Sequence, residues 1–196
     1  AAAPGGKSTH IAERMGDRGR VIACDVDARR LRKLEENARR LGLHSIEPLA
    51  LDGRRLGDRF AGAADRVLAD VPCTGLGVIA RRPDLRWRKA PGDITALAAL
   101  QRELLASAAA CLKPGGVLVY STCTTEPEEN QDVVAAFLRE TDGEFAAEDL
   151  RPWLPPALRD EPGAAEGWIQ LWPHRHGVDG FFIARIRRRP AERGEA

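Results

Sequence analysis

Short apolar runs alternate with amphipathic helical segments along this chain, and this alternation limits the folds open to it. Strands are predicted over 21–24, 46–51, 65–70 and 117–120. The spacing of apolar residues between them predicts helices, the two longest over 28–41 and 94–112. Strands that alternate with helices form a parallel sheet with helices on both faces. The sequence therefore predicts an α/β fold with a doubly wound, mostly parallel sheet.

The two ends of the chain modify this prediction. Two apolar runs near the carboxyl end, 167–172 and 180–186, predict a closing antiparallel strand pair, and 145–166 is expected to be irregular. The first residues form a glycine-rich loop, which normally follows a strand, so we expect a fragment whose first strand is missing. We expect one domain over 1–189 and a disordered tail over 190–196.

Composition limits the classes of partner and compartment. The chain has 196 residues and balances 30 basic against 29 acidic side chains, so a polyanion would have to bind a local patch. Its four cysteines form no CxxC pair, which argues against zinc and against a disulfide framework. No apolar run is long enough to cross a bilayer. We expect a monomeric cytoplasmic protein with reduced thiols, no metal and no membrane partner.

The segment 81–89 is the most basic local patch. It holds five basic residues, one acid and Trp87. Arginines beside an aromatic ring suit RNA phosphates and an unstacked base. A mobile arginine-rich loop explains the same composition, and both interpretations stay open.

Acids follow three of the predicted strands, at Asp25, Asp52 and Asp70. Together with the loop 1–8 they would line one edge of the sheet, where ligands bind in open α/β folds. A carboxylate suits a ribose diol, although aspartates at strand ends also cap helices. Three such acids beside a glycine-rich loop indicate a nucleoside-type cofactor.

The same loop also suggests a different reaction class. Gly6, Lys7 and Ser8 match the end of the phosphate-binding pattern GxxxxGK[ST], and the run 67–70 resembles a magnesium-binding strand. However, Ala1 stands where the pattern needs glycine, and Pro4 and Asp25 do not fit it. A P-loop-like ATPase therefore remains the alternative from another class.

Two cysteines are candidates for chemistry. Cys73 and Cys123 follow strands that are expected to be neighbours, and Pro72 ends the first of these strands. Two thiols that face one pocket suggest nucleophilic catalysis. Cys24 and Cys111 are expected to be structural. His174 and His176 lack nearby acid or cysteine ligands, so we do not expect a metal there.

Several sequence motifs, in order, resemble one family. They are Ala2-Ala3-Pro4-Gly5-Gly6-Lys7, Asp70-Val71-Pro72-Cys73, the run 74–79, the arginine segment to Trp87, Ser121-Thr122-Cys123-Thr124, Pro127-Glu128-Glu129-Asn130 and Asp179-Gly180-Phe181-Phe182. Together they resemble the S-adenosylmethionine-dependent RNA cytosine-C5 methyltransferases of the Sun/Nop superfamily. The chain is most similar to the bacterial RsmB-type enzymes, which methylate small-subunit ribosomal RNA. The resemblance runs from residue 1 to about residue 187 and implies a Rossmann-like class I methyltransferase sheet.

The resemblance also implies roles for individual residues. The cofactor loop would comprise Ala1, Ala2, Ala3, Pro4, Gly5, Gly6 and Lys7, with Lys7 also at the reaction. Asp25 would bind the ribose of S-adenosylmethionine, Asp52 would lie beside its adenine, and Asp70 would lie between cofactor and target base. Cys123 would be the nucleophile and Cys73 would assist release of the methylated RNA. Val71 and Thr124 are mild departures from the family pattern.

Other activities remain open on the sequence alone. A transfer-RNA cytosine-C5 methyltransferase of the same superfamily would carry the same motifs. A DNA cytosine-C5 methyltransferase would use Cys73 as its nucleophile, which the Thr-Cys pair at 122–123 argues against. A catalytically silent RNA-binding relative would be expected to lack Lys7, Asp70 or Cys123, and all three are present.

Overall fold

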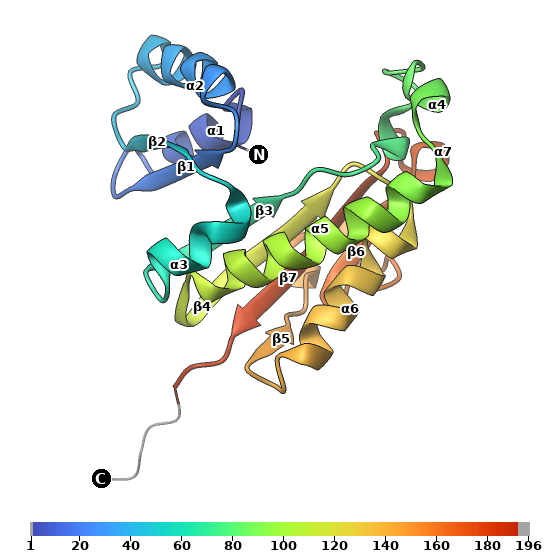
Figure 1. Cartoon of the computed structure of the whole chain (residues 1–196). Coiled ribbons are helices and arrows are strands. Elements are labelled where there is room, and N and C mark those ends of the chain that lie inside the picture. The colour runs from blue at the N-terminus through green and yellow to red at the C-terminus, as the bar shows by residue number, and fades with distance from the viewer. Residues whose placement is uncertain (1, 192–196) are drawn as a thin grey trace, which may run out of the picture. The chain divides into compact units, whose positions relative to one another are not determined.

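The computed structural model describes residues 2–191, which form two compact units (Figure 1). The first unit ends at Leu56 and the second begins at Gly57. Each unit is described by itself below. Most of the predicted disordered tail, residues 192–196, lies outside the described residues.

The first unit is a two-stranded parallel sheet with two helices. Its elements are α1 (Gly6–Arg14), β1 (Val21–Asp25), α2 (Ala28–Arg40), β2 (Ile46–Ala50) and a 3-10 turn (Gly53–Arg55). The register of β1 and β2 runs from Val21 beside Ile46 to Asp25 beside Ala50. The Asp27 side chain accepts hydrogen bonds from the backbone of Arg29 and Arg30 and so caps the N-terminus of α2.

The second unit is a five-stranded mixed sheet. Its strands are β3 (Ala64–Asp70), β4 (Leu112–Thr122), β5 (Phe145–Ala147), β6 (Trp168–Leu171) and β7 (Phe181–Arg188). Its helices are α3 (Leu56–Phe60, of which Leu56 belongs to the first unit), α4 (Leu85–Arg88), α5 (Pro91–Ala110), α6 (Gln131–Glu140) and α7 (Pro173–His176). Short 3-10 turns cover Leu76–Val78, Pro127–Glu129, Arg151–Trp153 and Pro156–Leu158.

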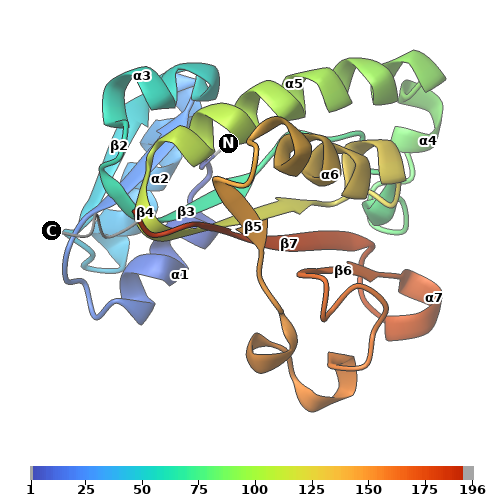
Figure 2. The same ribbon diagram turned by 90° about the horizontal axis from the view of Figure 1, so that it is seen from below.

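The strand order in this sheet is β3-β4-β7-β5, and β6 also pairs with β7. Strands β3 and β4 are parallel, whereas β7 runs antiparallel to β4, β5 and β6. The predicted antiparallel pair near the carboxyl end is therefore confirmed. Helices α5 and α6 lie on one face of the sheet and α7 lies on the other (Figure 2). Large buried side chains, including Leu105, Tyr120, Phe137 and Phe182, fill the core.

Within residues 2–191 the strands form two sheets, the β1–β2 pair and the larger sheet. The bounds of some elements differ from the prediction. The predicted irregular segment 145–166 contains a short strand, β5, because its backbone pairs with β7. Strand β4 begins earlier than predicted, at Leu112, and its pairing with β3 contains a register shift. That irregularity lets the strand include the glycines that were expected to separate it from α5.

Two helix starts also differ from the prediction. Helix α1 begins at Gly6, inside the segment 1–8 that was predicted as a loop. Helix α5 begins at Pro91 with Ala90 as its N-cap, and Asp93 lies inside the first turn. The Asp93 carboxylate still satisfies a backbone group there, because its Oδ2 accepts from Ala90 N at 2.9 Å. Within the described residues, no helix is both long and apolar enough to cross a membrane.

Candidate functional site

The glycine-rich loop of the first unit is held mainly through its backbone. Ala2 N donates to Cys24 O at 2.9 Å, and Ala3 N donates to Asp25 Oδ2 at 3.1 Å. Two side chains from α2 fix the carbonyls, since Arg30 Nη2 donates to Ala3 O and Asn37 Nδ2 donates to Pro4 O. The loop is therefore tied to the carboxyl end of β1 and to α2 before it enters α1.

Gly5 is the position in this loop where only glycine fits. Its φ angle is +111°, a conformation that other L-residues rarely adopt. A Cβ atom there would also lie 2.9 Å from Leu34 Cγ and 3.2 Å from Leu34 Cα. The loop then opens α1 at Gly6, with Lys7 exposed on its first turn. A loop that leads into a helix N-terminus presents backbone N–H groups and a favourable dipole to an anionic group.

Asp25 is the buried acid of this region, with 2% of its surface exposed. Its Oδ2 accepts from Ala3 N, and its Oδ1 accepts from Asp27 N at 3.0 Å. A carboxylate can accept about four hydrogen bonds, so these two contacts leave acceptor capacity on both oxygens. In this structure the Asp25 carboxylate holds the glycine-rich loop through its hydrogen bond from Ala3 N.

Asp52 follows β2, as predicted, and its carboxylate holds Arg54. The Arg54 Nη2 atom lies 2.6 Å from Asp52 Oδ2, and Arg54 N donates to Asp52 Oδ1. These hydrogen bonds lower the pKa of Asp52 to about 2. Asp52 therefore carries a negative charge at neutral pH at the end of β2.

The carboxyl ends of β3 and β4 bring together the other predicted residues, all in the second unit. Asp70 ends β3 directly beside Ser121 of β4, and Ser121 Oγ donates to Asp70 Oδ1 at 2.9 Å. Cys73 and Cys123 lie just beyond these strand ends. The prediction that the two cysteines follow neighbouring parallel strands is confirmed. The prediction that Asp25, Asp52 and Asp70 share one sheet edge stays a prediction.

The two thiols are in direct contact. Cys73 Sγ lies 3.3 Å from Cys123 Sγ, and both side chains are partly buried. The hydrogen bond to Cys123 and the burial of the side chain raise the pKa of the Cys73 thiol well above its usual value. Burial beside a second thiol thus disfavours the thiolate form of Cys73.

The chain around Cys123 is fixed by contacts on both sides. Thr122 Oγ1 donates to Asn130 Oδ1 at 2.6 Å, and Asn130 Nδ2 donates to Thr124 O at 3.1 Å. The backbone of Gly77 donates to Cys123 O at 3.1 Å. A Cβ atom on Gly77 would lie 2.2 Å from Gly180 O, so glycine is required for this close approach.

Sequence reasoning gave no role to Asn130 or Glu129, which are both fully buried beside the cysteine segments. They occur in the Pro-Glu-Glu-Asn motif, which served only to support the family resemblance. Residue type alone could not mark Glu129 as buried, because its neighbour Glu128 is the same residue and is exposed. Both residues have partners far away in the chain, because Glu129 accepts from Thr74 and Asn130 Nδ2 donates to Gln170 Oε1 at 3.0 Å.

The basic segment forms an exposed surface. Helix α4 carries Trp87, which is 84% exposed, and Arg88, whose guanidinium lies 3.2 Å from Asp84 Oδ2. Arg81 Nε lies 3.2 Å from Asp179 Oδ2, which ties the segment to the loop before β7. Basic groups and an exposed indole are thus available together on one short segment.

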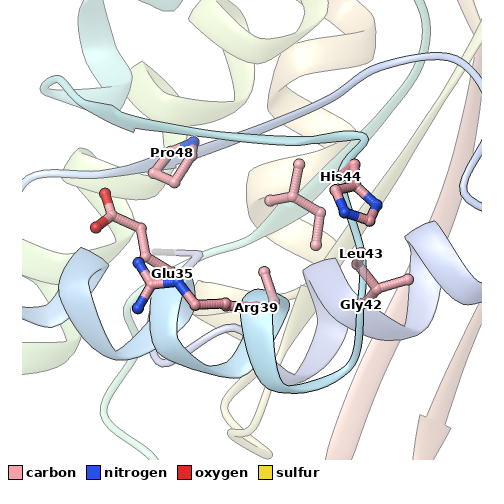
Figure 3. A pocket seen from close by; sticks show the side chains of 8 residues that line it. Glu35, Arg39, Gly42, Leu43, His44 and Pro48 are labelled. Carbon is pink, nitrogen blue, oxygen red and sulfur yellow. The ribbon is translucent and has the colours of Figure 1, made fainter.

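A separate cavity of about 280 Å³ lies between α2 and β2 in the first unit (Figure 3). It is lined by Glu35, Ala38, Arg39, Gly42, Leu43, His44, Ile46 and Pro48. None of the predicted site residues lines this cavity. In the part of the chain that the structure describes, no group of three or more His, Cys, Asp or Glu side chains is placed to hold a metal ion. His176 instead accepts a hydrogen bond from Trp172 N through Nδ1 at 2.8 Å.

Comparison with known proteins places the chain in a class and then in a family. The crystal structure of NSun6 from Pyrococcus horikoshii with SFG superposes with a TM-score of 0.83 at 40% identity, over 96% of this chain and 46% of that one. The fold is thus the Rossmann-like fold of the methyltransferases. The family profile described as 16S rRNA methyltransferase RsmB/F matches residues 1–187, and the chain belongs to this family.

Two curated relatives illustrate the range of this similarity. The probable ribosomal RNA small subunit methyltransferase B of Bacillus subtilis is 42% identical over 96% of this chain and 42% of its own length. The tRNA (cytosine(72)-C(5))-methyltransferase of Pyrococcus horikoshii is 41% identical over 96% of this chain and 46% of its own length. The chain therefore spans less than half the length of these relatives.

Proposed function

We propose that this chain is the methyltransferase part of an RNA cytosine-C5 methyltransferase that acts on 16S ribosomal RNA. The observation that carries the proposal is the thiol pair, Cys73 and Cys123, 3.3 Å apart beside Asp70 at the ends of two parallel strands. Family membership supports the reaction class. A transfer-RNA substrate is the second candidate, because a relative named as a tRNA methyltransferase is equally similar.

The arrangement suits addition and elimination at a cytosine ring. Cytosine C5 is a poor nucleophile until a thiolate adds at C6, which gives C5 enamine character. Cys123 would form this bond, and Asp70 would hydrogen-bond near N3 and the exocyclic amine, which favours the addition. Once C5 carries the methyl group, a base takes the C5 proton, the C5–C6 double bond re-forms, and the C6–sulfur bond breaks with its electron pair returning to Cys123. Cys73, as a protonated thiol against Cys123, is placed to stabilise the departing thiolate.

S-adenosylmethionine is the cofactor of this family, and it supplies an electrophilic methyl group when bound. The loop at 2–7 fits a ligand of this kind, because Gly5 lets the backbone approach closely and α1 presents its N-terminus. Asp25 retains acceptor capacity for ribose hydroxyls. We assign Ala1, Ala2, Ala3, Pro4, Gly5, Gly6 and Lys7 to the cofactor loop, with Asp25, Asp52 and Asp70 as further cofactor contacts, and we place Lys7 also at the reaction.

We also propose that residues 1–189 form one catalytic domain within a longer protein. Strands β1 and β3 each pair on only one side within the described residues. The family profile matches residues 1–187, which supports a single domain over nearly this range. The basic segment with exposed Trp87 is assigned to RNA phosphates and to an unstacked base.

The experiment that tests this function uses the full-length protein, 16S ribosomal RNA, transfer RNA and labelled S-adenosylmethionine. We expect label at cytosine C5 of the ribosomal RNA. Cys123→Ala should lower methyl transfer by at least about 10³-fold, as expected for loss of a covalent nucleophile. The matched control, Cys111→Ala, changes a buried cysteine away from the thiol pair and should keep activity. Label in transfer RNA alone would select the second candidate, and an active Cys123→Ala protein would contradict the mechanism.

A further inference from the structure

Glu129 is a fully buried acid whose carboxylate contacts two separate segments of the second unit. Its Oε2 accepts from Thr74 N at 2.9 Å and from Gln101 Nε2 at 2.8 Å. Its Oε1 accepts from Thr74 Oγ1. A buried carboxylate is costly unless donors surround it, and these three hydrogen bonds offset the cost of burying Glu129.

The contacts extend from Glu129 to both cysteine segments. Thr74 Oγ1 lies 2.9 Å from Thr124 Oγ1. Because Thr74 gives its hydroxyl proton to Glu129, Thr124 must be the donor in its contact with Thr74. Thr74 directly follows Cys73, and Thr124 directly follows Cys123. One chain of hydrogen bonds therefore connects the residues next to the two thiols.

A second contact fixes the Cys73 segment from α5. Gln101 Nε2 donates to Pro72 O at 2.9 Å and also to Glu129 Oε2. The two residues that flank Cys73, Pro72 and Thr74, are thus held by groups that meet at Glu129. Tyr120 OH donates to Glu129 O at 2.7 Å, which attaches the Glu129 backbone to β4, the strand that leads to Cys123.

We propose that Glu129 is a positioning residue that sets the approach of Cys73 to Cys123. It touches neither thiol and acts through Thr74 and Thr124. An apolar side chain could fill the same space without any need for donors, so the carboxylate makes the geometry of the Cys73 segment specific. In the proposed function, this geometry matters most for release of the product, when Cys73 must reach the departing Cys123 sulfur.

The test measures how readily the two thiols form a disulfide in the full-length protein. Diamide accepts one thiolate at its N=N bond, and the second thiol then displaces the reduced hydrazine, which leaves a disulfide. In Glu129→Gln, one carboxylate oxygen becomes an NH2 group, so the side chain can no longer accept at both positions and loses its charge. We expect the Cys73–Cys123 disulfide, followed by mass spectrometry, to form roughly tenfold more slowly, consistent with loss of a hydrogen bond to a charged group.

The matched control is Glu128→Gln, the same chemical change at the exposed neighbour, and its rate should equal that of the unmodified protein. Thermal melting checks that the variants fold. If Glu129→Gln does not fold, the role of Glu129 is tested through its partner Thr74. Thr74→Val removes the hydroxyl that contacts Glu129, whereas Thr74→Ser keeps it. Thr74→Val should be slow and Thr74→Ser should restore the rate. A folded Glu129→Gln protein, or a Thr74→Val protein, that crosslinks at the unmodified rate would overturn the proposal.

A second measurement tests whether Glu129 affects release of the methylated RNA. This part of the inference rests on the proposed function. We expect Glu129→Gln to accumulate the covalent RNA adduct while the KM for RNA stays unchanged. If the unmodified protein transfers no methyl group, the proposed function fails and the crosslinking rates still decide the role of Glu129. Normal adduct turnover together with slow crosslinking would contradict the catalytic role.

Discussion

The two units hold their candidate site residues by different kinds of contact. In the first unit, the glycine-rich loop is fixed by backbone hydrogen bonds, by Asp25 and by the special conformation of Gly5. In the second unit, side chains such as Glu129 and Asn130 fix the cysteine segments. The difference teaches that the first site needs a special backbone conformation at Gly5, whereas the second needs two polar side chains, Glu129 and Asn130, that are fully buried.

The hydrophobic cores of the two units also differ, in the size of the side chains that fill them. The first unit packs small side chains, Ala3, Ala12, Ala23 and Ala38, around Leu31, Leu34 and Ile46. The second unit packs large aromatic and aliphatic side chains against five strands. A two-stranded sheet with a small core is only marginally stable. We therefore expect the first unit to be the less stable of the two.

The largest expected effect is on stability and comes from Gly5→Ala, which should destabilise the first unit but not the second. Gly5→Ala should destabilise the first unit by about 2–5 kcal/mol, because a left-handed backbone costs about 1–2 kcal/mol for alanine and overpacking adds about 1–3 kcal/mol. Gly6→Ala is the control for stability, since a Cβ there meets nothing within 4 Å. The expected order of stability is Gly6→Ala above Gly5→Ala.

Urea denaturation can follow the two units separately. All four tryptophans lie in the second unit, whereas circular dichroism reports helices in both. In Gly5→Ala, the dichroism transition should move to lower urea while the tryptophan transition stays in place. If the two transitions coincide and move together, the units unfold as one, and the expected difference in stability between them would be contradicted.

The next effect tests the thiol contact of the second unit. The raised pKa of Cys73 predicts that its alkylation by iodoacetamide stays slow at pH 8, because little thiolate is present. Cys123→Ala removes the hydrogen-bond partner, which is the largest cause of the shift. The apparent pKa of Cys73 should then fall by at least about one unit, which gives a roughly tenfold larger thiolate fraction. Mass spectrometry of the alkylated peptide across a pH series measures it, and Cys111→Ala is the control.

The smallest effect concerns Asp52 in the first unit. Its pKa of about 2 lies below the value of about 3.9 expected for an unfolded chain, so its pairing with Arg54 stabilises the folded state above about pH 4. That contribution is lost as the pH falls through about 2. Both side chains are partly exposed, so the contribution should not exceed about 1 kcal/mol. Arg54→Ala should raise the Asp52 pKa toward about 3.9 in a carboxyl NMR titration, and an unchanged value would contradict the pairing.

Much of the fold was predictable because it follows local pattern. The apolar runs predicted the strands, and parallel pairing of β3 with β4 brings Cys73 and Cys123 together at one edge. The cap at Asp27 and the closing antiparallel pair also follow from local sequence. The beginning of β4 did not, because the register shift opposite Ala64 depends on the partner strand rather than on the sequence of β4.

The parts of the site that escaped prediction depend on distant partners. Glu129 and Thr74 are 55 positions apart in the chain, and no spacing within either segment indicates that they meet. Asp25 was predicted as a ribose ligand, but its anchoring of Ala3 depends on how the loop folds back onto β1. Similarly, the charge of Asp52 was expected, whereas its bidentate contact with Arg54 required the turn geometry.

The most direct test of the account identifies the cysteine that bonds to RNA. Full-length Cys73→Ala protein is incubated with 16S ribosomal RNA and S-adenosylmethionine, digested with protease and nuclease, and analysed by mass spectrometry. The account predicts that the adduct accumulates and that methylated cytidine is attached to the peptide that carries Cys123. Attachment to another residue, or no adduct from a protein that still methylates RNA, would contradict it.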